Sequence, residues 1–200
     1  MTTSMSPSIT KGQAVKFTDL QIDALRKSGL PKKETQEVLE ENGDVLANEF
    51  LKLVRERVER KLEMIVRRVK VDRSLTPEQV IDETGRVKWY INEEALAKMP
   101  RGEGEEVDVY FFPAKRFMPV KEYEAELAKY GLVPDPRAQA AVNRDDLAFA
   151  DTHPNGVQWD GNAYATFCRN DERRVHVSRN DVDWYDSIWF GGVRKIVATK

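Results

Sequence analysis

The chain has 200 residues, of which 40% are hydrophobic and 33% are charged, and its formal net charge is −2. The apolar share is sufficient for a buried core and excludes wholesale disorder, while the slightly acidic balance argues against a general polyanion binder. A single cysteine, Cys168, excludes an intramolecular disulfide, and no apolar run is long enough for a transmembrane helix.

These features, together with a serine- and threonine-rich start that lacks a signal-peptide core, predict a cytoplasmic protein that does not associate with membranes. The first 16 residues are predicted to be a disordered arm, and residues 17–100 to be mainly helical. Thr18 and Gln21 match a capping box and predict where the first helix starts. Gly29 is placed to end that helix.

A long amphipathic helix is the clearest element of the sequence. A second short helix is expected after Pro31 and ends at Asn42–Gly43. From Val45 to Val69, apolar residues then recur at steps of three and four, which predicts one helix of roughly 25 residues. Its apolar stripe makes self-association through this helix one of the expected partnerships.

The segment after the long helix contains two short helices and a strand. Thr76–Gln79 is a strong helix start with proline at the first helical position. Val87–Ile91 is predicted to be a strand, and Glu93–Met99 a brief helix capped by Asn92. The polar loop Arg101–Gly104 is then the predicted boundary between the two halves of the chain.

Residues 105–200 are predicted to be an α+β region. A strand is expected at 107–112 and helices at 120–130 and 136–142, whereas 145–159 is predicted to be polar loop. The chain is expected to end in a three-stranded antiparallel meander. The fold class is therefore α+β, with an N-terminal helical region containing one long amphipathic helix and a small C-terminal antiparallel sheet with helices. The three strands of the meander are Ala163–Arg169, Arg174–Arg179 and Ser187–Ile196.

The stretch 20–54 combines apolar helix residues with two turn signals. These residues are Ile22, Leu25, Gly29–Leu30, Val38–Leu39, Asn42–Val45, Ala47 and Phe50–Leu51. With them the stretch resembles a UBA-like three-helix fold. The resemblance implies a small helical module that docks protein partners through its Gly29–Leu30 loop, and a generic helical hairpin is the alternative.

The C-terminal stretch resembles a group of small uncharacterised bacterial proteins. This resemblance rests on Phe149–Asp151, His153–Gly156, Trp159 and Trp189–Lys195. It covers much of the chain but implies no activity and supplies no catalytic residues.

Basic side chains gather on the predicted long helix. Five of them are placed to contact phosphates from one side of the helix and are candidates for binding a nucleic acid or another partner. The alternative is a solvated helix face that carries pairs such as Glu56–Arg60 and Glu63–Arg67. The five candidates are Arg57, Arg60, Lys61, Arg67 and Arg68.

Aromatic residues gather near the C-terminus, interleaved with arginines. Trp159, Trp184 and Trp189, together with Arg179, form a candidate stacking surface for bases or for a protein partner. A small β core filled by large rings is the alternative interpretation.

The two histidines offer a different reading. Asp151, His153 and His176 are candidates for general acid–base chemistry or for a metal with an open position. That reading requires the two histidines to approach each other, although they are distant in sequence, and a loop residue and a strand-surface residue are the alternatives. The leading hypothesis is a non-enzymatic interaction protein with a protein or nucleic-acid partner and no cofactor, and a small hydrolase or metal-assisted enzyme is the competing one.

Overall fold

The computed structural model describes residues 10–61, 63–179 and 183–194. The chain divides into two compact units, Met1–Glu56 and Arg57–Lys200. We call their described parts the helical unit and the sheet unit. The predicted boundary at Arg101–Gly104 therefore differs from the division that the structure has. The reason is that strands on both sides of this loop pair within one sheet.

The helical unit begins with α1 (Lys11–Lys27). Thr10, rather than Thr18, is the N-cap, and it forms the capping box with Gln13. The sequence offers two Thr-x-x-Gln boxes, and the helix uses the earlier one, so the Thr18 hydroxyl donates to the Ala14 carbonyl inside the helix. The prediction of a disordered arm is wrong for residues 10–16, and residues 1–9 lie outside the described part. Gly29 follows the helix with a positive φ of 70°.

The helix α2 (Lys32–Lys61) replaces the two helices predicted on either side of Asn42–Gly43. Asn42 has non-helical angles (φ −126°, ψ 17°), so the predicted break is a kink within one continuous helix. The predicted long helix is wrong beyond Lys61. Glu63 adopts a left-handed φ of 60°, and the β-branched residues that follow belong to strand β1 (Ile65–Lys70). Arg67 and Arg68 are therefore strand residues.

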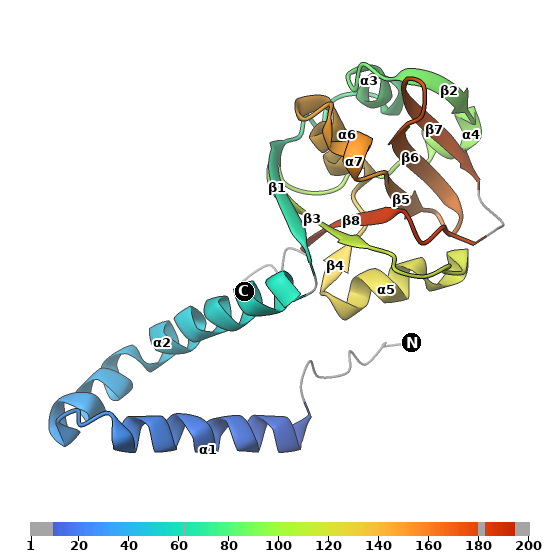
Figure 1. Cartoon of the computed structure of the whole chain (residues 1–200). Coiled ribbons are helices and arrows are strands. Elements are labelled where there is room, and N and C mark those ends of the chain that lie inside the picture. The colour runs from blue at the N-terminus through green and yellow to red at the C-terminus, as the bar shows by residue number, and fades with distance from the viewer. Residues whose placement is uncertain (1–9, 62, 180–182, 195–200) are drawn as a thin grey trace. The chain divides into compact units, whose positions relative to one another are not determined.

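The sheet unit is built on an eight-stranded mixed sheet (Figure 1). Its strand order is β1-β3-β8-β5-β6-β7-β2, and β4 pairs with β8 outside this path. The pairs β2–β7 and β5–β8 are parallel, and the remaining pairs are antiparallel. The α+β class is confirmed, but the sheet is mixed and large. The strands not yet given are β2 (Val87–Ile91), β3 (Glu106–Pro113), β4 (Leu132–Val133), β5 (Asn155–Trp159), β6 (Ala163–Arg169), β7 (Arg173–Arg179) and β8 (Trp189–Arg194).

The predicted C-terminal meander is only half present. β6 and β7 form the expected antiparallel hairpin, but β8 pairs with β3, β4 and β5 instead of with β7. On its other side, β7 pairs with β2, and these two strands are parallel. The stretch predicted as polar loop also contains a short helix and strand β5, all of whose residues are buried. Two residues of β5, Asn155 and Gln158, are polar although they are buried. The hydropathy pattern therefore did not indicate a strand here.

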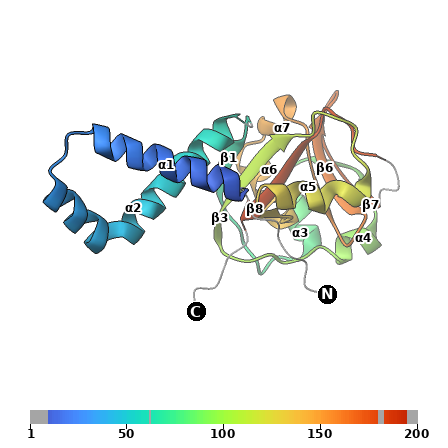
Figure 2. The ribbon, with the colours of Figure 1, turned by 90° about the horizontal axis from the view of Figure 1, so that it is seen from below.

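Helices cover both faces of the sheet (Figures 1 and 2). Those on one face pack on alternate residues of the strands, such as Phe111, and α5 covers the opposite face near Phe112. In α6, every residue from Pro136 to Asn143 is buried. The helices are α3 (Pro77–Asp82), α4 (Glu93–Ala97), α6 (Pro136–Asp145) and α7 (Phe149–Thr152) on the first face and η1 (Val120–Glu122) with α5 (Tyr123–Lys129) on the other.

The predicted helix starts in the sheet unit are confirmed. Thr76 forms its capping box with Gln79, and Asn92 caps α4. Within the described residues, no helix is both long and apolar enough to cross a membrane.

Candidate interaction surfaces

The five basic candidates do not lie on one helix face. Arg57 and Lys61 are at the end of α2, Arg67 and Arg68 are on β1, and the side chain of Arg60 lies outside the description. Because successive strand residues point to opposite faces, Arg67 and Arg68 cannot act from one side.

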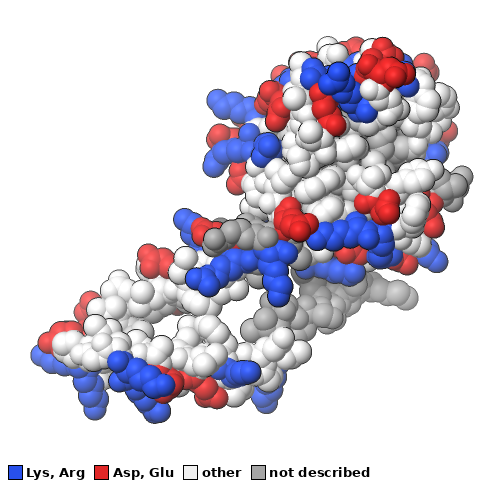
Figure 3. Space-filling model, viewed as in Figure 1, with Lys and Arg blue, Asp and Glu red and all other residues white. Residues whose placement is uncertain are grey.

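Both β1 arginines also have partners within the chain. The Arg67 guanidinium lies 5.1 Å from the centre of the Phe149 ring and 3.9 Å from the Asp146 carboxylate. Arg68 Nε donates to the Glu106 carboxylate at 3.2 Å. Figure 3 shows Lys and Arg side chains beside Asp and Glu side chains over much of the face in view. The geometry gives a shared phosphate-binding face no support.

The aromatic candidates are largely internal. Trp159 and Trp184 are both 3% exposed, and their indole nitrogens donate to the Ala95 carbonyl and to Gln158 Oε1. Trp189 is half-buried. The predicted stacking surface is therefore wrong for Trp159 and Trp184, which fill the core because a small sheet uses large rings to occupy its volume.

Arg179 is likewise engaged within the chain. It donates to Asn162 Oδ1 at 2.8 Å and lies 3.3 Å from the Glu94 carboxylate and 3.5 Å from that of Asp160. These contacts tie β7 to α4 and to the turn that precedes β6. They account for this arginine without an external partner.

The predicted catalytic trio is dispersed among different neighbours. Asp151 accepts hydrogen bonds from Arg173 (2.8 and 3.0 Å) and Arg169 (3.2 Å), and the Arg173 bond is the main cause that lowers the pKa of Asp151. His153 Nδ1 lies 2.8 Å from the Thr152 hydroxyl. The ring of His153 stacks on Phe149 and meets Trp189 edge-on.

His176 lies on strand β7 among an entirely different set of side chains. Within residues 10–61, 63–179 and 183–194, no three His, Cys, Asp or Glu side chains are grouped to hold a metal. The contacts of Asp151, His153 and His176 have no member in common, so the geometry does not assemble the site that the enzyme reading requires.

An exposed aromatic cluster surrounds His176 instead. The rings of Trp89, Tyr90 and Tyr164 lie edge-on to the His176 ring, with centroid distances of 5.3, 5.4 and 5.4 Å. Trp89 is 63% exposed and Tyr90 50%. The Arg174 guanidinium lies 5.7 Å from the centre of the Trp89 ring. We call these five residues the His176 cluster.

A β-bulge produces this cluster. The pairing of β2 with β7 shifts between Lys88 and Tyr90, so Trp89 is an extra residue in the strand. Adjacent strand residues normally face opposite sides, but here Trp89 and Tyr90 both reach His176. The sequence predicts the strand but not the bulge, for which the adjacent pair of large aromatic residues is the available signal.

The electrostatics of the His176 cluster favour a neutral imidazole. Burial lowers the pKa of His176, and its Nδ1 lies 3.3 Å from the Tyr164 hydroxyl. Burial also raises the pKa of Tyr164. Arg174 contributes a positive charge to the cluster, and its guanidinium lies 3.3 Å from the Glu172 carboxylate.

A second exposed surface covers the helical unit. No residue of α1 is buried, and the contact between the helices centres on Phe17 and Phe50, whose rings stack at 4.6 Å. Twelve large apolar side chains elsewhere on the two helices and, at Leu30, in the loop between them are 36–59% exposed. They are Val15, Leu20, Ile22, Leu25, Leu30, Val38, Leu39, Val45, Leu46, Leu51, Leu53 and Val54.

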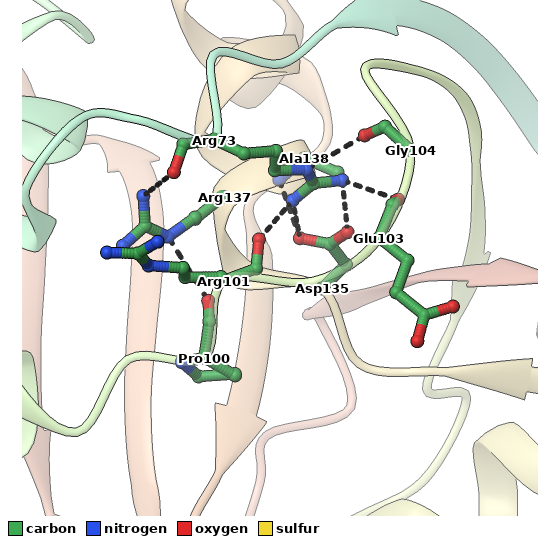
Figure 4. A network of polar contacts seen from close by, with 8 residues as sticks. All are labelled: Arg73, Pro100, Arg101, Glu103, Gly104, Asp135, Arg137 and Ala138. Carbon is green, nitrogen blue, oxygen red and sulfur yellow. Dashed lines mark hydrogen bonds and ion pairs between the residues drawn. The ribbon is translucent and has the colours of Figure 1, made fainter.

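A network of polar contacts fixes the start of α6 (Figure 4). Arg73 binds both carboxylate oxygens of the buried Asp135, at 2.7 and 2.9 Å, and Asp135 also caps α6 by accepting from the Ala138 amide. Arg73 further donates to the carbonyls of Arg101, Glu103 and Gly104. The N–H groups of Arg73 are thereby used within the chain, and the network anchors the loop 101–104 to the helix.

A surface cavity of about 440 Å³ lies beside this network. Its described lining includes the carboxylates of Glu103, Glu106 and Asp108 and the ring of Tyr110, but no histidine, cysteine, serine or threonine. The lining thus lacks a paired nucleophile and base.

The chain matches no family model, curated protein or solved structure. The resemblances to a UBA-like fold and to small bacterial proteins therefore stay predictions.

Proposed function

We propose that this chain is a non-catalytic interaction protein whose helical unit binds a protein partner. The observation that carries the proposal is the set of twelve large apolar side chains left exposed in the helical unit, eleven on α1 and α2 and one, Leu30, in the loop between them. Apolar side chains exposed in this number within one small unit indicate a contact site, because their contact with water is unfavourable.

Helix energetics support the same conclusion. Most helical stability in proteins comes from packing an apolar face, and no residue of α1 is buried. Only the stack of Phe17 on Phe50 joins rings of the two helices. A bound partner supplies the missing burial and stabilises both helices.

Photocrosslinking in the cells that produce the protein tests this proposal. Benzoylphenylalanine in place of Leu20, which is 59% exposed, is expected to give an adduct of defined mass. The matched control replaces Phe117 of the sheet unit, which is 57% exposed and apolar. Adducts at residue 20 but not at residue 117 support the proposal. Equal labelling at both sites, or labelling at residue 117 alone, contradicts it.

A second candidate function rests on the His176 cluster. The bulge that turns Trp89 and Tyr90 to one face creates a pair of accessible rings on which unpaired nucleic-acid bases can stack. With Arg174 as the cation in contact with the cluster, we expect about one phosphate contact and a salt slope near −0.7, the value for one charge on a single strand.

Fluorescence anisotropy with labelled single-stranded DNA and RNA tests the second candidate. Trp89→Ala is expected to weaken binding, because stacking contributes about 1–3 kcal/mol per base. Tyr185→Ala is the control, since Tyr185 has the same exposed fraction, 63%, as Trp89 but lies outside the cluster. If both substitutions leave the affinity unchanged, or if no oligonucleotide binds at low salt, the stacking role is rejected.

A further inference from the structure

We infer that the partner of the helical unit is a second copy of the same chain, and that two α1–α2 pairs form an antiparallel four-helix bundle. This inference rests on the proposed function and names its partner. It is carried by the placement of apolar residues around each helix, by the area they expose and by the charges of the two helices.

Each helix has apolar residues on the side away from its neighbour. In α1, Val15 and Ile22 are seven residues apart and share one side, whereas Phe17, which contacts α2, is turned by about 200° from Val15 at 100° per residue. In α2, Leu51 is similarly turned away from Phe50, by about 100°. A helix that is apolar on two sides requires two neighbours, which is the environment of every helix in a four-helix bundle.

The exposed area suits a dimer. The uncovered half of twelve aliphatic side chains is on the order of 500 Å² in each copy, or about 1,000 Å² for two copies from side chains alone. A specific interface between proteins buries at least about 1,000 Å² in total. One further helix from another protein covers only one of the two apolar sides, so a second pair of helices fits better.

The charge of α1 is complementary to that of the middle of α2, whereas α2 as a whole carries seven basic and eight acidic residues, a balance of −1. α1 carries four basic residues and two acidic ones, a balance of +2, whereas the stretch Glu34–Glu49 of α2 carries six acidic residues and no basic one, a balance of −6. In a dimer with a two-fold axis, α1 of each copy contacts α2 of the other copy, so this contact occurs twice in the dimer. The ion pairs Lys27–Asp23 and Lys33–Glu37 lie within single helices, and the second copy provides opposite charge across helices. The charged residues counted are Lys11, Lys16, Asp19, Asp23, Arg26 and Lys27 in α1, and Glu34, Glu37, Glu40, Glu41, Asp44 and Glu49 in α2.

Sedimentation equilibrium of the purified full chain tests the inference from micromolar to submillimolar concentration. The expected mass is twice the chain mass of 23.0 kDa. The double variant Ile22→Glu and Leu51→Glu changes side chains that face away from the contact within one copy, and we expect it to raise the dissociation constant at least about 100-fold. The matched control, Phe117→Glu and Tyr185→Glu, places the same charges on exposed apolar residues of the sheet unit and is expected to remain dimeric.

Three results would overturn the inference. The first is a mass of 23.0 kDa at every concentration, and the second is a dimer that the sheet-unit control dissociates. The third is a dimer that the helical double variant leaves intact while circular dichroism shows its helices unchanged. A purified monomer whose residue 20 crosslinks in cells to a different polypeptide rejects the second copy but leaves the proposed function standing. Absence of any adduct at residue 20 rejects the proposed function itself.

Discussion

The two units use the same local signals but bury their helices to very different extents. α1 and α6 both begin at a polar side chain that caps the first turn, Thr10 and Asp135 respectively. α6 then buries eight consecutive residues in the sheet unit, whereas α1 buries none in the helical unit. Capping therefore fixes where a helix starts but not what covers it. The buried core that stabilises the chain is therefore in the sheet unit, whereas the helical unit has apolar side chains that nothing within the unit buries.

The largest expected change in the free energy of unfolding comes from removing an aromatic ring from the core. Phe111 is fully buried against Phe149, so Phe111→Ala is expected to lower the free energy of unfolding of the sheet unit by about 3–5 kcal/mol. Urea unfolding followed by tryptophan fluorescence measures it, because all four tryptophans lie in the sheet unit. Phe50→Ala in the helical unit is the matched substitution and is expected to leave this transition unchanged. A comparable loss in both variants breaks the comparison between the units.

The next effect concerns the anchor of α6. Asp135→Asn keeps an oxygen that can accept from the Ala138 amide but removes the charge that Arg73 binds through both oxygens. We expect the free energy of unfolding to fall by about 1.5–3 kcal/mol, the range for hydrogen bonds to charged groups. The same urea titration measures it. An unchanged midpoint indicates that the backbone carbonyls around Arg73 are sufficient to hold the guanidinium.

A smaller effect is expected where the sheet approaches α6 most closely. A Cβ atom on Gly191 would collide with Gln139 Oε1 and would lie 2.9 Å from a carbon of the Phe111 ring. Gly191→Ala is therefore expected to cost about 1–3 kcal/mol through overpacking. Gly43→Ala in the helical unit is the control, because a Cβ atom on Gly43 has no neighbour within 4 Å. It is expected to leave the urea midpoint of the fluorescence transition unchanged. Equal midpoints for the wild type and Gly191→Ala contradict the tight contact.

The smallest effect is a pH dependence from His176. Burial lowers its pKa in the folded chain below the ordinary 6.5, so the unfolded chain binds more protons between those two values. The free energy of unfolding of the sheet unit is thus expected to fall as the pH drops from about 6.5 toward the lower pKa of folded His176. Above about pH 6.5, His176 is expected to have no effect on it. Urea midpoints at about pH 8 and about pH 5, compared with those of His176→Gln, measure the contribution. A variant with the same pH profile as the wild type rules out this contribution.

Local chemistry made much of the fold predictable. The capped helix starts at Thr76 and Asn92, the strands at 87–91 and 107–112 and the hairpin of β6 and β7 all follow from short-range signals. The end of α2 was missed because Val66 and Val69 continue the helical spacing of three. In β1 they point to opposite faces, Val69 buried and Val66 39% exposed, and pairing with β3 decides for the strand.

The sites were less predictable, because they depend on long-range pairing. Asn155 and Gln158 are polar residues in a buried strand, so β5 left no hydropathy signal. The position of Trp89 beside His176 is created by a bulge between strands far apart in the sequence. Composition likewise marked Trp159 and Trp184 as candidates, but only the fold shows that they are internal.

The place of β8 in the sheet has a consequence for synthesis on the ribosome. β8 is the last of the described strands along the chain, yet it lies between β3 and β5 and joins the two halves of the sheet. Until residues 189–194 emerge, the nascent chain carries two open strand edges that invite pairing with other chains. The helices α1 and α2 emerge first, so contacts between neighbouring nascent chains can form before either sheet closes.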